Sequence, residues 1–245
     1  MNSDERREQI AQNLAAVRER IAAACAAAGR DPSSVTLVAI TKTYPAADVV
    51  HLAQLGVRDV GENRDQDAAP KAAEVAAALA EAAAPTWHFV GQLQRNKCRS
   101  VVGYADVVHS VDSVRLVRAL ATAAAAGRER PLEALVQVSL DGDLDRGGAA
   151  LATDDPDRSF DRVAEAIAGS SGLRLAGVMA VAPLSVNPLA AFASLAGVAE
   201  RLLKDHPSAT IISAGMSGDL AEAIANGATH VRIGSALLGN RPPLR

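Results

Sequence analysis

Residues 35–43 read VTLVAITKT, a run of β-branched and aliphatic residues that ends at Lys42 between two threonines. A continuously apolar run of this length is typical of a strand buried on both faces of a parallel sheet. Similar runs recur along the chain, with longer amphipathic stretches between them. Together the predicted strands cover residues 35–40, 57–60, 87–90, 106–109, 134–138, 173–178, 210–212 and 230–233.

Helical patterns fill the stretches around these strands. A first helix is predicted from about residue 4 to residue 28, where apolar residues recur at helical spacing between Arg and Glu. Gly29 closes it, since glycine tolerates the left-handed conformation that often ends a helix. Further helices are predicted over residues 45–55, after residue 112 and over residues 219–225. A polar Gly/Asp-rich loop is expected over residues 141–156.

Eight strands that alternate with helices predict an α/β fold, a closed (β/α)8 barrel of the TIM type with an extra N-terminal helix over residues 1–30. The competing fold is a doubly wound open sheet. The first strand is not followed by GxGxxG, and the glycine-rich phosphate-binding candidate comes late in the chain, so the barrel is favoured. We expect one domain over residues 1–245, because no linker divides the chain.

Composition excludes several classes of function. The net charge of −3 provides no field for nucleic acid or an anionic membrane, and aromatic residues, at 2%, are too few for base-stacking surfaces. Cys25 and Cys98 do not form a disulfide framework or a metal-ligand pattern. The N-terminus lacks the apolar core of a signal peptide. We therefore expect a soluble cytoplasmic protein without bound metal.

Lys42 is the strongest candidate for chemistry. Active sites of (β/α)8 barrels form at the carboxyl ends of the strands, and Lys42 directly follows the first one. Partial desolvation there would favour the neutral amine, a nucleophile that forms imines. The other lysines fall in predicted helices or after a turn, where solvated lysines are normal. The alternative is that Lys42 is an ion-pair partner at the rim.

Two glycine- and serine-containing loops predict a phosphate site. ISAGMSGD follows the seventh strand, and VRIGSALLG spans the eighth and its following turn. These are the positions of the recurrent phosphate site in such barrels, and helices expected to begin near Ser217 and Ser235 would direct their N-termini at an anion. Ordinary turns and helix caps are the alternative. The predicted hydroxyl ligands are Ser213, Ser217 and Ser235, and the glycines are Gly215, Gly218 and Gly234.

Arg232 lies within the eighth strand, between Val231 and Ile233. Strand alternation directs the two aliphatic side chains to the outer helices and Arg232 into the barrel. A buried guanidinium needs a partner. The partner is either a structural carboxylate such as Glu62 or a ring nitrogen of a bound cofactor.

Five segments together resemble a known family. They are GENRDQD (61–67), WHFVGQLQRNK (87–97), VHSVDS (108–113), AGVMAVAP (176–183) and SAGMSGDLAEAIANGATHVRIGSALLG (213–239). In order and spacing they are similar to the pyridoxal phosphate homeostasis proteins, also described as proline synthetase co-transcribed homologues. The resemblance runs from about residue 35 to residue 239. It implies the fold-type III barrel of the alanine racemases without their second domain, and pyridoxal 5'-phosphate as cofactor.

The resemblance also implies roles for individual residues. Lys42 matches the lysine that forms the Schiff base, Asn63 a residue beside the cofactor ring, and Arg232 the arginine that faces the pyridine nitrogen. The positions that match residues around the phosphate are Ser213, Ser217, Gly234 and Ser235. Ser235 replaces a common threonine and keeps the hydroxyl. Gln92 and Tyr44 replace a common histidine and a common lysine, and no role is assigned to either.

The leading functional hypothesis is a non-catalytic protein that holds pyridoxal phosphate on Lys42 and buffers it or passes it to apo-enzymes. An amino acid racemase is the second hypothesis, and a cofactor-free barrel enzyme that uses Lys42 for aldol chemistry is the third. Racemisation needs a base on each face of the carbanion. The resemblance implies that racemases take the second base, a tyrosine, from another domain across a dimer. We expect no such domain here, no turnover and a monomer.

Overall fold

The computed structural model describes residues 2–79 and 84–239, and its strands form a closed barrel in the order β1 to β8. Every neighbouring pair is parallel, including β8 with β1. This confirms the predicted barrel, with strand boundaries shifted by at most two residues. The strands are β1 Thr36–Ile40, β2 Asp59–Glu62, β3 Thr86–Phe89, β4 Val107–Val111, β5 Leu132–Gln137, β6 Leu173–Met179, β7 Ile211–Ser213 and β8 His230–Ile233.

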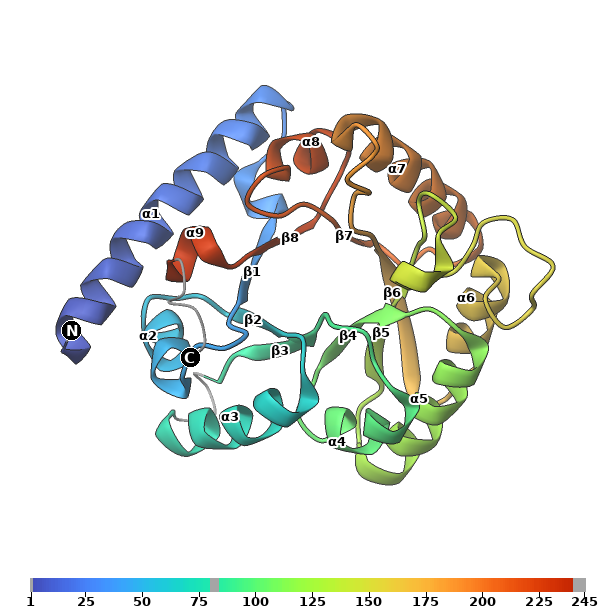
Figure 1. Ribbon diagram of the computed structural model, residues 1–245, viewed down its shortest axis with the longest axis horizontal. Coiled ribbons are helices and arrows are strands. Elements are labelled where there is room, and N and C mark those ends of the chain that lie inside the picture. The colour runs from blue at the N-terminus through green and yellow to red at the C-terminus, as the bar shows by residue number, and fades with distance from the viewer. Residues whose placement is uncertain (1, 80–83, 240–245) are drawn as a thin grey trace.

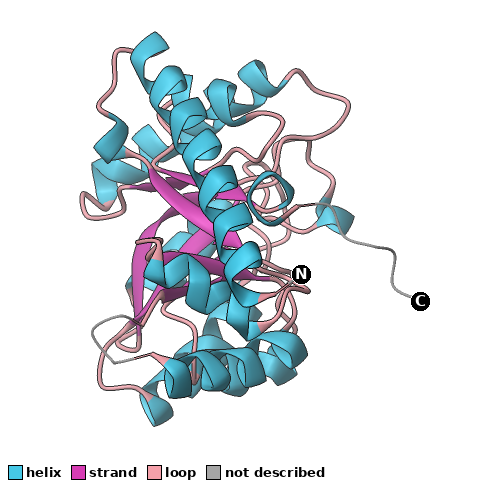
Figure 2. Ribbon diagram, turned by 90° about the vertical axis from the view of Figure 1, so that its left-hand side faces the viewer, coloured by secondary structure: helices cyan, strands magenta, loops and turns pink. Residues whose placement is uncertain are grey.

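Helices surround the ring of strands, and α1 lies outside it beside α9 (Figure 1). In the side view the strands occupy the centre and helices flank them (Figure 2). The helices are α1 Ser3–Ala27, α2 Ala46–Gln54, α3 Asp65–Ala78, α4 Cys98–Val102, α5 Val114–Gly127, α6 Phe160–Ala168, α7 Pro188–Asp205, α8 Leu220–Ala225 and α9 Ser235–Leu238. Short 3-10 helices are Pro32–Ser34, Arg95–Lys97 and Leu144–Arg146.

The predicted N-terminal helix is confirmed as α1. Asn2 and Glu5 form a capping box at its start, and Gly29 follows its end with φ +64°. The apolar stripe of α1 is buried against α8, α9 and α2, because a spacing of three to four residues puts these side chains on one face. The stripe consists of Ile10, Leu14, Val17, Ile21 and Cys25.

Strand alternation separates two environments in the barrel wall. Val231 and Ile233 of β8 join the outer apolar cluster that includes the face of α1, whereas Arg232 between them is buried and bonds to β7. A small apolar cluster of Val107, Leu135, Ala176 and Met179 is separate from the two outer clusters. The barrel therefore presents aliphatic residues to the helices and keeps the Arg232 guanidinium inside.

Two loops differ in detail from the prediction. The helix expected to begin near Ser217 begins at Leu220, because residues 214–219 form a loop in which Gly215 has φ +89°. The predicted polar loop over residues 141–156 is present, with one 3-10 turn inside it. Both cysteines are free and buried. None of the helices built by residues 2–79 and 84–239 combines the length and the apolar character needed to cross a bilayer.

Gly177 of β6 provides a test of the strand packing. A Cβ at this position would lie 1.9 Å from the Ile211 carbonyl oxygen, and its φ of +149° disfavours a side chain. We expect Gly177→Ala to lower the free energy of unfolding by about 2–4 kcal/mol, because β6 and β7 must separate. Gly197→Ala, in α7 with open space around the glycine, is the control and should raise stability by about 0.5–1 kcal/mol. Urea denaturation measures both, and equal effects would contradict the packing.

Candidate functional site

The predicted site residues gather at the carboxyl ends of four adjacent strands. The order β7–β8–β1–β2 is continuous in the ring, so the loops that follow these strands are neighbours. A Cβ on Gly234 would lie 3.4 Å from the Cβ of Ile40, which brings the end of β8 beside the end of β1. The residues collected there are Lys42, Asn63, Ser217, Arg232, Gly234 and Ser235, with Ser213 below them at the end of β7.

Lys42 lies in the turn that follows β1, and its side chain is exposed at the rim. The turn carries the residue past the end of the buried strand, and its expected partial desolvation stays a prediction. The next residue, Thr43, has φ +75°, which a β-branched residue adopts only under strain of about 1–3 kcal/mol. This conformation directs the chain away from the barrel immediately after the candidate nucleophile.

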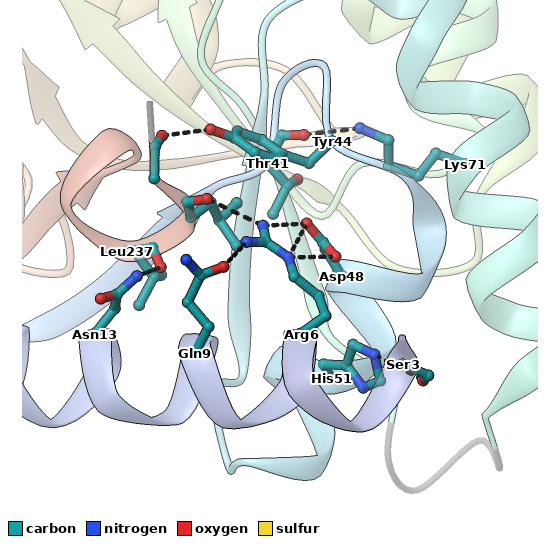
Figure 3. Close-up of polar contacts among 12 residues, drawn as sticks. Ser3, Arg6, Gln9, Asn13, Thr41, Tyr44, Asp48, His51, Lys71 and Leu237 are labelled. Carbon is teal, nitrogen blue, oxygen red and sulfur yellow. Dashed lines mark hydrogen bonds and ion pairs between the residues drawn. The ribbon is translucent and has the colours of Figure 1, made fainter. Parts of the chain in front are cut away.

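Lys71 of α3 is buried, contrary to the expectation that it is a solvated helical lysine. Its Nζ lies 2.5 Å from Glu62 Oε1. It also donates to the Thr41 carbonyl oxygen at 2.9 Å (Figure 3). Thr41 Oγ1 donates to the same Glu62 oxygen at 2.7 Å. Lys71 thus anchors the backbone directly before Lys42. Lys71 lies on the helix that begins in the GENRDQD segment, and no local pattern there indicates its burial.

Asn63 follows β2 and is half-buried. Its backbone is packed against Gly91, where an added Cβ would lie 2.0 Å from the Asn63 carbonyl oxygen. Only glycine at position 91 allows the two loops to approach this closely. The β3 loop therefore fixes the backbone of the residue predicted to lie beside a cofactor ring.

The two predicted phosphate loops are held by contacts beneath them. Gly215 combines its positive φ with close contact to Ala223, whose Cβ would be 2.7 Å from an added Cβ. The Ser217 carbonyl accepts from Arg20 of α1 at 2.6 Å, and the Met216 amide donates to Asp219 Oδ1 at 2.6 Å. Ser217 is half-buried and Ser235 is exposed. Both residues follow the carboxyl ends of their strands, and their contact with a phosphate stays a prediction.

Arg232 is fully buried, and its partners are not the carboxylate considered from the sequence. The guanidinium donates from Nη1 to the carbonyl and the hydroxyl of Ser213, at 2.8 and 2.7 Å, and from Nη2 to the Ala180 carbonyl at 2.9 Å. Glu62 is wrong as a partner because it contacts Thr41 and α3 instead. Burial lowers the pKa of Arg232 to about 10, so the group is charged at neutral pH.

Ser213 is fully buried, and its hydroxyl also lies 2.9 Å from His109 Nδ1. His109 in turn lies 2.8 Å from His88, and both histidines are buried. Their connection to Arg232 could not be read from the sequence. These contacts place the Ser213 hydroxyl beneath Arg232, away from the rim. Its predicted contact with a phosphate stays a prediction.

The N-terminal helix holds the segment that follows β8 (Figure 3). Arg6 of α1 binds Asp48 of α2 at 2.6 Å and donates to the Leu238 carbonyl at 3.0 Å, while Asn13 donates to the Leu237 carbonyl at 3.0 Å. The Tyr44 hydroxyl donates to the Gly239 carbonyl at 2.5 Å. The carbonyls at the end of α9 are thus satisfied by side chains, which fixes the preceding Gly234–Ser235 turn.

Comparisons with known proteins agree with this architecture. Residues 10–242 match the model of the alanine racemase N-terminal domain family. A pyridoxal phosphate homeostasis protein of Mycobacterium leprae is 46% identical over 244 residues, which cover 96% of this chain and 94% of that protein. The solved structure of PipY from Synechococcus elongatus, with PLP bound, is 34% identical with a TM-score of 0.77, covering 94% of this chain and all of PipY.

The chain belongs to the pyridoxal phosphate homeostasis protein family. Alanine racemase from Corynebacterium glutamicum, at 14% identity and a TM-score of 0.64, shares the fold over 98% of this chain and 63% of the racemase. As a member of the pyridoxal phosphate homeostasis proteins, the chain spans nearly the full length of the curated relatives described above. The resemblance drawn from the five sequence segments is confirmed.

The buried Lys71–Glu62 pair predicts a characteristic mutational pattern. Lys71→Met leaves the Glu62 carboxylate, which is 0% exposed, without its cation, and we expect a loss of about 3–5 kcal/mol of unfolding free energy. The double variant Lys71→Met/Glu62→Leu should recover most of this loss, because it removes both charges. Urea denaturation measures the cycle. Additive losses in the double variant would show that the two charges are not coupled.

Two histidines predict how stability depends on pH. Burial lowers the pKa of His230 to about 4 and holds the pKa of His109 well below the usual 6.5. Below about pH 6.5 the unfolded chain binds protons that the folded chain excludes, so the unfolding free energy should fall toward pH 4, by up to about 1.4 kcal/mol per pH unit for each histidine. Urea denaturation at pH 7, 6 and 5 measures the slope. His230→Gln should reduce it by one proton, and an unchanged slope would contradict the assignment.

Proposed function

We propose that this protein binds pyridoxal 5'-phosphate at the carboxyl end of the barrel as a Schiff base on Lys42, and serves intracellular pyridoxal phosphate homeostasis in the cytoplasm. One observation carries the proposal. The turn after β1 carries Lys42 beside two glycine-containing loops and above a buried arginine, on four contiguous strands. The naming of relatives and the PLP-bound state of PipY support the same ligand.

The donor set fits the three functional groups of this cofactor. Lys42 supplies the amine for the aldehyde, and Asn63 lies on the neighbouring strand end. Ser217, Gly234 and Ser235 supply hydroxyls and backbone amides for the phosphate, as hydrogen bonds to charged groups require. Gly234 brings its backbone against Ile40, so the phosphate and amine sides of the site are adjacent.

Pyridoxal phosphate, when bound, supplies an aldehyde for amines and a ring that withdraws electrons from an attached carbon. Arg232 lies beneath the rim with its guanidinium fixed by carbonyls and by Ser213. A fixed cation that faces the ring nitrogen disfavours protonation of that nitrogen, which weakens electron withdrawal. The site is therefore better suited to holding the cofactor than to driving carbanion chemistry.

An amino acid racemase is the alternative function. The chain has two tyrosines that could act as the opposing base. The Tyr44 hydroxyl donates to the Gly239 carbonyl, and Arg6 lies 5.7 Å from its ring centroid. Tyr104 precedes β4 at the amino end of the barrel, edge-on to Trp87, and burial raises its pKa. These contacts favour the carrier, which acts as a monomer and delivers the cofactor to apo-enzymes.

Borohydride labelling tests the proposal. The holo-protein should be yellow, and reduction should fix a pyridoxyl group on the peptide that contains Lys42. Lys42→Ala should abolish the chromophore without lowering the melting temperature, because the side chain is exposed at the rim. Lys97→Ala, a partly exposed lysine of the 3-10 helix after β3, is the matched control and should keep the chromophore.

Label on Lys71 or Lys97 would refute the assignment of Lys42. Chiral chromatography of alanine and serine after long incubation with the same holo-protein separates carrier from racemase. Sustained racemisation that is lost in Tyr44→Phe would replace the carrier by the enzyme.

A further inference from the structure

Hydrogen bonds cross the interior of the barrel and connect Arg232 to a carboxylate. Asp59 Oδ1 lies 3.0 Å from His88 Nε2, and His88 Nδ1 lies 2.8 Å from His109 Nε2. His109 Nδ1 lies 2.9 Å from Ser213 Oγ, which accepts from Arg232 at 2.7 Å. β3 and β4 lie across the ring from β7 and β8 (Figure 1), so the bonds pass through the barrel. We call these five residues the interior chain.

The carboxylate at one end and the guanidinium at the other constrain the direction of the donors. A carboxylate only accepts, so His88 must carry its proton on Nε2, facing Asp59. If His88 Nδ1 is the acceptor in the bond to His109, the proton of His109 lies on Nε2. His109 accepts at Nδ1 from the hydroxyl of Ser213. Burial holds the pKa of His109 well below its usual value, in agreement with a neutral ring.

The interior chain links a buried cation to an anion. Arg232 is fully buried, and the acceptors that hold its guanidinium are neutral groups of Ser213 and Ala180. Asp219 interacts with it electrostatically, but its carboxylate accepts from the Met216 amide. Buried ions need compensation, and aligned hydrogen bonds polarise one another. The carboxylate of Asp59 is the anion at the far end of this alignment.

The two ends lie on opposite sides of the barrel. Asp59 is the first residue of β2 and lines a cavity of about 550 Å³ with Val35 and Thr36, at the amino ends of the strands. Ala180 and Ser213, which hold Arg232, lie at the carboxyl ends of β6 and β7. The interior chain therefore connects the amino-terminal end of the barrel to the carboxyl-terminal end, where the candidate site lies.

We propose that Asp59 is a positioning residue for Arg232, and that it fixes the guanidinium beneath the ligand ring through His88, His109 and Ser213. The ligand part of this inference rests on the proposed function. The titratable neighbours of the chain are His230, whose ring centroid lies 6.2 Å from that of His88, and Asp219 near Arg232. Asp59 has the only carboxylate hydrogen-bonded to the chain among the residues that the structure describes.

The first test uses the protein without added cofactor. Nitrogen-15 NMR of histidine-labelled protein reports which ring nitrogen carries the proton. His88 and His109 should both be protonated on Nε2 alone. A proton on Nδ1 of His109 would reverse the direction of the chain and overturn the proposal. In Asp59→Asn the new amide can donate as well as accept, so both tautomers of His109 should become populated. A single unchanged tautomer in this variant would also overturn it.

The second test uses pyridoxal phosphate itself as the probe. Asp59→Asn should weaken its binding on the order of tenfold, since a charge-assisted alignment is lost, and should shift the absorption maximum of the bound cofactor. Asp106→Asn is the matched control, because Asp106 directly precedes β4 but binds the Trp87 amide and Arg128 outside the chain. Equal spectra and affinities for the two variants would refute the role of Asp59.

The two tests separate this inference from the proposed function. If wild-type protein does not bind pyridoxal phosphate, the proposed function fails, whereas the histidine tautomers still decide whether Asp59 directs the interior chain. If wild-type protein binds the cofactor and Asp59→Asn behaves like Asp106→Asn, only the inference fails. Thermal melting of each variant shows whether the fold is kept. An Asp59→Asn variant that does not fold leaves the wild-type tautomers as the deciding measurement.

Discussion

Closure of the parallel sheet is the constraint on which the rest of the structure depends. In a closed ring, inward side chains of strands far apart in sequence share one water-poor space. Each inward polar group must find its partner across the ring, which is why Ser213 of β7 meets His109 of β4. On β8 the same alternation places Val231 and Ile233 against the helices and Arg232 inside. The ring thus supports a guanidinium without an adjacent carboxylate.

The fold could be predicted from the sequence because each strand lies in a β-favouring or apolar stretch and each gap is long enough for a helix. Those features are local, and they located all eight strands. The site was accessible as a set of strand ends, which placed Lys42 beside Gly234. The exposure of individual side chains could be predicted less well from the sequence. Lys71 was expected in solvent because lysines on predicted helices are normally solvated, and the packing of α3 on β2 instead brings it against Glu62. The connection of His88 to Arg232 depends on ring closure, which no local pattern encodes.

The two lysines near the rim divide two tasks between them. The ammonium of Lys71 is buried and donates hydrogen bonds to Glu62 and to the Thr41 carbonyl. Lys42, which directly follows Thr41, is an exposed residue in the turn after β1. A rigid backbone therefore carries a side chain that can reach outward. The left-handed Thr43 completes this arrangement, since it turns the chain sharply after the lysine.

The packing of α1 has a consequence for the order in which the chain can fold. Its apolar stripe is covered mainly by α8 and α9, which are encoded about two hundred residues later. During synthesis the stripe around Leu14 and Val17 leaves the ribosome first. It stays exposed until α8 and α9, near the other end of the chain, have also emerged. Closure of the ring between β1 and β8 has the same requirement. The segments at the two ends of the chain therefore pack together late in folding. Until they do, the sheet stays open, with unpaired strand edges that can bind other chains.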